Sequence, residues 1–138
     1  MKVKVGIILQ AQSVLKKIIE EKRPLPTKGK YRIVRLFETL TKEADIIEGQ
    51  RVVLIKQFGI VNSDNSWQVE ARNVERFQAE WNKILEDEID VNIQPIPLSY
   101  LEAPAQVEIV GDDGIRKMID PISLDELLFL GPLVMEEQ

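Results

Sequence analysis

The sequence contains no cysteine and no histidine among its 138 residues. Without cysteine there is no disulfide framework, thiolate nucleophile, zinc finger or iron–sulfur ligation. Without histidine the chain lacks the commonest general base near neutral pH and the commonest metal ligand. Serine–histidine–aspartate and cysteine–histidine catalysis are therefore excluded, and we expect a protein that is not an enzyme and that uses no metal and no cofactor.

Long apolar runs are also missing. The run near the N-terminus, 7–9, stops at Gln10, whereas a signal peptide needs roughly 7–15 apolar residues and a membrane-spanning helix about 20. The glycine-rich fingerprints of nucleotide-binding loops are absent as well. We therefore expect a cytoplasmic protein without membrane contact.

Charge, in contrast, is plentiful and unevenly divided. Residues 1–59 carry 13 Lys and Arg against 6 Asp and Glu, a net charge of +7, and residues 60–138 carry 5 against 17, a net charge of −12. The length fits one domain, 1–138, in which we expect a basic helical hairpin (1–59) and an acidic α+β part (60–138). Such a division is typical of halves that pack on each other, within one chain or between copies, or of a surface for phosphate or an acidic partner.

The basic charge peaks in the segment 16–35, where only Glu20 and Glu21 oppose eight basic side chains: Lys16, Lys17, Lys22, Arg23, Lys28, Lys30, Arg32 and Arg35. This segment is the candidate nucleic-acid surface, although Tyr31 is its only aromatic residue and no stacking platform is visible. In the acidic half, the run 86–90 follows a predicted helix at the end where the helix dipole disfavours negative charge. A basic partner, which can be the basic half of the same protein, would offset this unfavourable interaction with the helix dipole.

Apolar spacing predicts a mainly helical core. Apolar residues recur every three or four positions from about 8 to 22, from about 28 to 58 and from 74 to about 86. This spacing predicts three helices, of which the first two are antiparallel. We expect Thr27 and Asn73 to be N-caps and Gly59 to end the second helix in the left-handed conformation. Gly49 is a weak point within this long helix, at which a bend or a break can form. Trp81 falls on the apolar stripe of the third helix and is expected in the core.

Short strands are predicted between and after these helices. Residues 60–61 and 67–69 flank a polar loop, and residues 107–110 and 115–118 flank Gly111-Asp112-Asp113-Gly114, whose composition suits a tight turn better than a divalent-metal site. Ser123 and Glu126 form a capping-box pattern before a short helix, 124–130. The apolar closing segment, 127–135, either docks on the core or forms a partner-binding patch, and we expect docking. The fold class is therefore α+β: an antiparallel helix pair and a third amphipathic helix, with one or two small β-hairpins.

The order of these elements resembles a widespread family of small tailed-bacteriophage proteins of unassigned function. The resemblance rests on a Lys-Val-Lys-Val start, a helix that ends before Leu25-Pro26, Tyr31 opening a long helix, and the segments 48–51, 54–59, 96–102 and 127–132. Residues 103–120 depart from the family pattern and correspond to an inserted hairpin. The resemblance implies viral origin and transfers no catalytic residue.

These observations favour a non-enzymatic bacteriophage protein that acts by protein–protein binding in host takeover, counter-defence or virion assembly. We expect it in the cytoplasm of the infected host or in the virion, with a host or phage protein as partner, or a second copy bound through the oppositely charged halves. The alternative is nucleic-acid binding through the segment 16–35. The expected contact residues are Trp67, Asp112, Asp113, Lys22, Arg23, Lys28, Lys30 and Arg32.

Overall fold

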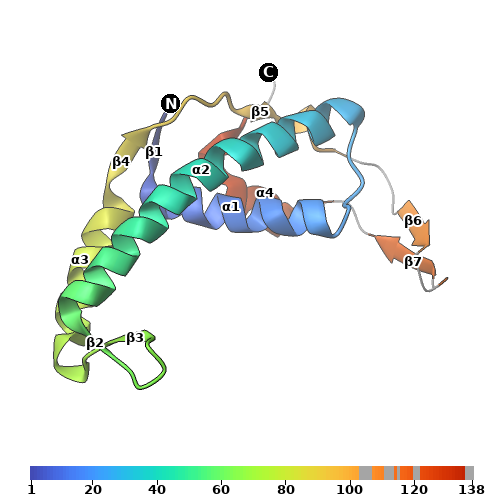
Figure 1. Ribbon diagram of the computed structural model, residues 1–138. Coiled ribbons are helices and arrows are strands. Elements are labelled where there is room, and N and C mark those ends of the chain that lie inside the picture. The colour runs from blue at the N-terminus through green and yellow to red at the C-terminus, as the bar shows by residue number, and fades with distance from the viewer. Residues whose placement is uncertain (103–106, 111–113, 115, 120–121, 136–138) are drawn as a thin grey trace.

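Two long antiparallel helices dominate the computed structural model, which describes residues 1–102, 107–110, 114, 116–119 and 122–135 (Figure 1). Helix α1 spans Val5–Glu20 and helix α2 spans Thr27–Phe58. The connector between them contains Pro24 and Pro26, which cannot continue a helix. The buried positions of α1 recur every three or four residues, a spacing that the sequence predicted from Ile8 onward: Val5, Ile8, Ala11, Leu15 and Ile18.

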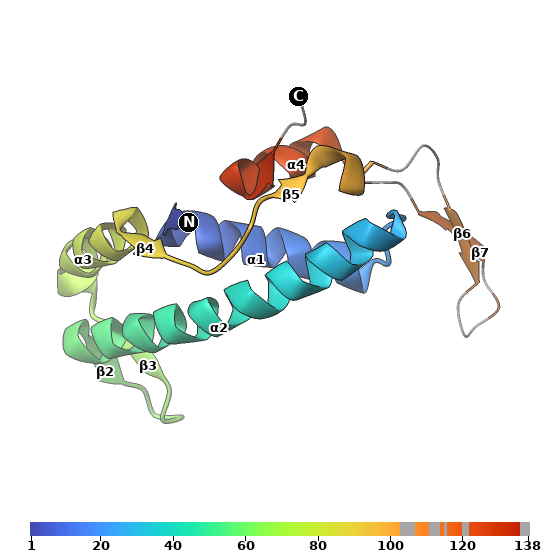
Figure 2. The ribbon, with the colours of Figure 1, turned by 90° about the horizontal axis from the view of Figure 1, so that it is seen from above.

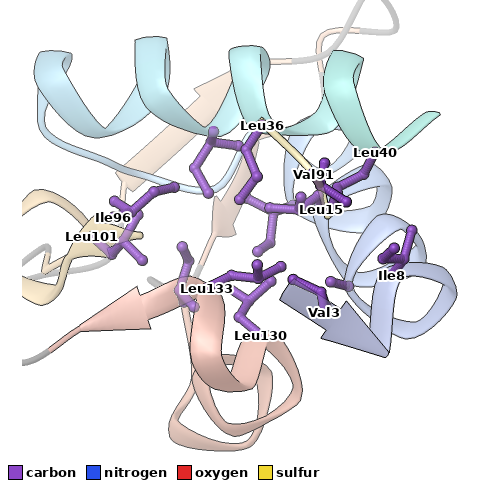
Figure 3. Packing of buried hydrophobic residues seen from close by; sticks show 14 of the residues in the cluster. Val3, Ile8, Leu15, Leu36, Leu40, Val91, Ile96, Leu101, Leu130 and Leu133 are labelled. Atoms are coloured by element: carbon purple, nitrogen blue, oxygen red, sulfur yellow. The ribbon is translucent and has the colours of Figure 1, made fainter. Parts of the chain in front are cut away.

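Helix α1 is the centre of the hydrophobic core. In Figure 2, α2 lies along one side of α1 and helix α4 (Leu124–Leu130) lies along the other. Figure 3 shows Leu15 of α1 between Leu36 and Leu40 of α2 and the C-terminal residues Leu130 and Leu133. Leu130 and Leu133 are fully buried, so the expected docking of the apolar C-terminal segment is confirmed.

The predicted capping box also forms. The backbone N–H of Glu126 donates to Ser123 Oγ (3.2 Å), and the backbone N–H of Ser123 donates to Glu126 Oε1 (3.0 Å). This reciprocal pair satisfies two donors that the first turn of α4 would otherwise leave without partners.

In the described residues, eight short strands form four two-stranded sheets, which together with the helices give the expected α+β, mainly helical fold. Both predicted hairpins are confirmed, and two further sheets join segments far apart in the chain. The antiparallel hairpins are β2 (Gly59–Val61) with β3 (Trp67–Val69) and β6 (Val107–Val110) with β7 (Arg116–Ile119). The distant pairs are β1 (Lys2–Lys4) with β4 (Glu88–Asp90), antiparallel, and β5 (Ile96–Pro97) with β8 (Val134–Met135), parallel.

The predicted long helix is confirmed and runs through Gly49 without a break, but two predictions about the ends of α2 were wrong. The helix begins at Thr27 itself, with Pro26 in the capping position and no side-chain cap. Gly59 is extended (φ −121°) rather than left-handed, because it already starts β2. Glycine is required there for a different reason: a Cβ would lie 2.4 Å from the carbonyl oxygen of Ile55 and 2.5 Å from that of Gln68.

Two predictions about helix α3 (Val74–Glu86) also need correction. Asn73 occupies the N-cap position but makes no capping hydrogen bond. It ends the 3₁₀ turn Ala71–Asn73, so its backbone is helical (φ −106°, ψ −1°), whereas a capping residue is normally extended. Its Nδ2 donates instead to the carbonyl oxygen of Phe58 (3.2 Å). Trp81 is half-buried and packs against the core rather than within it.

Candidate interaction surfaces

The predicted contact residues lie in several separate places in the structure. Arg23 binds two carboxylates of the same chain. Its guanidinium binds Glu21 (Nη1 to Oε2, 2.6 Å) and Glu126 (Nη2 to Oε1). The Arg23 and Glu126 side chains are only 12% and 9% exposed. This buried ion pair fastens the α1–α2 connector to α4. Neighbouring Lys22 is exposed and adopts a left-handed backbone (φ 52°).

Two further ion pairs join the basic half of the chain to the acidic half. Lys4 Nζ lies 2.9 Å from Glu86 Oε2, and the amino group of Met1 lies 2.9 Å from Asp90 Oδ1. The hydrogen bond to Glu86 raises the pKa of Lys4, and the hydrogen bond from the N-terminal amine lowers the pKa of Asp90. Two members of the acidic run at the end of α3, Glu86 and Asp90, therefore pair with basic groups at the start of the same chain, one of the interpretations that the sequence left open.

More than half of the exposed large apolar side chains of the described residues lie at the end of the molecule formed by residues 48–90, which we call the arm. It comprises the last turns of α2, the β2–β3 hairpin, α3 and β4 (Figure 1). The arm, every residue of which the structure describes, contains no buried residue. Six of its large apolar side chains are exposed: Val52, Val53, Ile60, Val61, Trp67 and Val74.

Trp67, the predicted anchor, lies within this apolar surface. Its indole is 42% exposed, and its cross-strand partner Val61 is 50% exposed. Lys56 Nζ lies 5.9 Å from the centroid of the indole ring, which brings α2 beside the hairpin. Val53, 57% exposed, precedes Lys56 by one helical turn. We call Val53, Val61 and Trp67 the arm patch. Sequence reasoning missed the two valines. Val53 and its neighbour Val52 form an apolar pair off the predicted core stripe of α2, which was a signal for Val53, whereas Val61 lies in the predicted strand opposite Trp67.

A second surface lies near the other end of α2. A cavity of about 440 Å³ separates α2 from the extended segment that precedes β5, and it is lined by Tyr31, Arg32, Arg35, Leu36, Thr39, Asn92, Ile93, Gln94 and Ile96. None of these residues is acidic. We call this cavity the guanidinium pocket, after Arg32 and Arg35. Sequence reasoning identified Arg32 as a contact residue but could not identify the residues of the opposite wall.

Both arginines of the guanidinium pocket have neutral partners. Arg32 Nη2 donates to the carbonyl oxygens of Gln94 (3.4 Å) and Pro95 (3.3 Å). Arg35 Nη1 donates to the hydroxyl of Tyr31 (2.9 Å), and this hydrogen bond raises the pKa of Arg35. Neither guanidinium forms an ion pair with a carboxylate in the part of the chain that the structure describes.

Lys28 and Arg32 meet at the ring of Tyr100, with Lys28 Nζ and Arg32 Cζ lying 5.7 Å and 5.9 Å from its centroid. Lys30 is exposed. These residues lie at the N-terminal end of α2, and Trp67 lies beside its C-terminal end (Figure 1), so the predicted contacts do not form one surface. Asp112 and Asp113 lie outside the described residues.

Within the described ranges, no cluster of three or more Asp and Glu residues is arranged to hold a metal ion, and no helix is both long and apolar enough to cross a membrane. Comparison with protein-family models, with curated proteins and with solved structures found no match to this chain.

Proposed function

We propose that the protein is a non-enzymatic bacteriophage protein that acts by binding another protein through the arm patch. The observation that carries the proposal is the contrast within the arm, which exposes six large apolar side chains and has no buried residue. Scattered exposed apolar residues are ordinary on protein surfaces, whereas apolar residues gathered on one region are typical of interaction sites.

The chemistry of the arm patch suits a protein partner. Trp67 offers a large, partly exposed ring, and tryptophan is among the residues that contribute most to binding energy at protein interfaces. Val61, its cross-strand partner, adds exposed apolar area beside it, Val53 adds exposed apolar area on α2 one helical turn before Lys56, and Lys56 supplies a positive charge near the ring. A partner with an apolar surface and an acidic edge would complement this arrangement. The resemblance to tailed-phage proteins supports a role in host takeover, counter-defence or virion assembly.

Site-specific photo-crosslinking in bacterial cells tests the proposal, because it captures a partner whose identity is still unknown. A photoreactive phenylalanine analogue replaces Val61 in one variant of the protein and Phe129 in another. The two positions are equally exposed, at 50% each, but Phe129 lies on α4, away from the arm. We expect a discrete covalent protein adduct from position 61 and none from position 129.

The variant Trp67→Ala in the position-61 background sharpens this test. We expect it to reduce the adduct strongly while the melting temperature changes little, because Trp67 has 42% of its surface exposed in the free protein. Equal adducts from positions 61 and 129, or no adduct from position 61, would refute the arm patch as a binding site.

A further inference from the structure

We propose that the guanidinium pocket binds the phosphate group of a ligand, with Arg32 and Arg35 as its two principal contacts. This site is separate from the arm patch, and the proposal does not depend on protein binding there. It rests on the placement of two guanidinium groups, the lack of acidic residues among those that line the cavity, and the chemistry of its remaining walls.

The helix places the two guanidinium groups on one face. Arg32 and Arg35 are three residues apart in α2, which puts their side chains about one turn apart on the same side. A guanidinium presents several N–H donors in a planar fork that matches two oxygens of a phosphate. Two such forks on one face match a doubly charged phosphate better than a carboxylate, which one fork alone can satisfy.

No acidic side chain lines the pocket, although Glu38, which lies outside the lining, also interacts with Arg35 and contributes to its raised pKa. The whole chain has a net charge of −5 and 23 acidic residues, yet none of the nine residues that line the pocket is acidic. Arg32 donates to two carbonyl oxygens at 3.3–3.4 Å, which are long hydrogen bonds, and Arg35 donates to a phenol. Charge-assisted hydrogen bonds to a phosphate are shorter and stronger than these. Replacement of the neutral partners by phosphate oxygens is therefore favourable.

The remaining walls indicate what is attached to the phosphate. Leu36 and Ile96 are buried and form an apolar floor, while Thr39, Asn92 and Gln94 supply neutral hydrogen-bonding groups. The cavity of about 440 Å³ lies within the range of small-molecule sites, which combine apolar walls with a few polar groups. A phosphate joined to a partly apolar body, as in a nucleoside monophosphate, fits this lining. The phosphate can also come from a nucleic-acid backbone, and the experiment separates the two sources.

Isothermal titration calorimetry on the full chain tests the proposal with four probes: inorganic phosphate, adenosine monophosphate, adenosine and a single-stranded oligonucleotide. We expect adenosine monophosphate to bind and adenosine, which lacks the phosphate, to bind at least about tenfold more weakly. Binding of the oligonucleotide in preference to the mononucleotide would identify a nucleic-acid backbone as the source of the phosphate. Absence of heat with phosphate, mononucleotide and oligonucleotide alike would overturn the proposal.

Three variants show whether the pocket itself is responsible. Arg32→Gln and Arg35→Gln should each weaken binding of the phosphate-bearing probe about tenfold, and Arg35→Lys should weaken it less, because it keeps the charge but loses the planar fork. Arg51→Gln is the matched control, because it removes the same group from the same helix at a position about 24 Å from Arg35 along the helix axis. An equal loss of affinity in Arg51→Gln would show that only the general charge of the protein acts, and would overturn the site.

Discussion

The two parts of α2 differ in what covers them, although they belong to one continuous helix. Between Thr27 and Ile47 the helix buries five residues: Gly29, Ile33, Leu36, Leu40 and Ile47. Between 48 and 58 it buries none. The apolar stripe continues through both parts, with Leu54, Ile55 and Phe58 half-exposed in the second. Composition therefore does not explain the difference, but length does.

A helix rises about 1.5 Å per residue, so the 16 residues of α1 extend about 24 Å and the 32 residues of α2 extend about 48 Å. Helix α1 can cover only half of its partner. That half, together with α1, α4 and the C-terminal segment, forms what we call the body. In the arm, α3 packs on α2, and the start of α1 also contacts α3 where Gly6 lies beside Leu85, yet no residue of the arm is buried (Figure 2). Because burial is the main source of stability, we expect the arm to open locally before the body unfolds.

The largest effect that tests this comparison comes from two leucines of α2. Leu40 is fully buried in the body, so Leu40→Ala should lower the free energy of unfolding by about 2–5 kcal/mol. Leu54 is half-exposed in the arm, so Leu54→Ala should cost less than about 1.5 kcal/mol. Urea denaturation of both variants measures the difference. Equal costs would show that the arm is packed as firmly as the body, and the comparison would fail.

Two carboxylate–arginine pairs extend the comparison to charge. Glu126 is buried against Arg23 in the body, whereas Glu48 is 55% exposed and pairs with Arg51 in the arm (2.6 Å). Glu126→Gln should cost about 1–3 kcal/mol, because Arg23 loses a buried charged partner. Glu48→Gln should cost less than about 1 kcal/mol, because water screens an exposed pair. Thermal unfolding of both variants is the measurement, and a larger cost for Glu48→Gln would contradict the expectation.

Local sequence signals predicted local structure well. The helices, both hairpins and the capping box at Ser123 and Glu126 follow from residues within a few positions of one another. The pairing of β1 with β4 and of β5 with β8 could not be predicted, because strands of two or three residues carry too little pattern to specify a partner about 40 or 90 positions away. The prediction of Trp81 in the core failed because periodicity identifies an apolar stripe without showing how many layers cover it.

The candidate sites also divide into those that local sequence signals identify and those that only the tertiary fold brings together. Trp67 could be identified from its place beside a polar loop, and its exposure in the structure agrees with that interpretation. The guanidinium pocket could not be identified, because Arg32 and Arg35 face residues 92–96, which reach them only through the tertiary fold. For Arg23 the sequence showed a basic segment but not the buried Glu126 that binds it.

A third comparison uses two glycines of α2. A Cβ at Gly49, at the start of the arm, would meet nothing within 4 Å, whereas a Cβ at Gly29, in the body, would lie 1.7 Å from the carbonyl oxygen of Tyr100. Gly49→Ala should therefore raise the free energy of unfolding by about 0.5–1 kcal/mol, because alanine favours the helix. Gly29→Ala, its control, should lower it by at least about 1 kcal/mol, because backbone atoms must shift. Destabilisation by Gly49→Ala would show that the arm is more tightly packed there.

The smallest expected effect concerns the joint between arm and body, where β4 pairs with β1. The N-terminal amine lowers the pKa of Asp90 in the folded state below its ordinary value of about 3.9. A carboxyl whose pKa is lower when folded stabilises the fold above its unfolded pKa, and this contribution is lost as the pH falls through the folded pKa. Stability should therefore decline below about pH 4, and Asp90→Asn should show a shallower decline than the unaltered chain.

Urea midpoints measured from pH 6 to pH 2.5 provide the test. Asp87→Asn is a control, because Asp87 contributes to the joint through its backbone carbonyl, which accepts a hydrogen bond from Val5 N–H (2.9 Å). If Asp90→Asn and the unaltered chain follow the same acid limb, the amine–carboxylate pair does not contribute to the joint, which the backbone pairing of β1 with β4, the Lys4–Glu86 pair and the packing of α1 on α3 then hold without it.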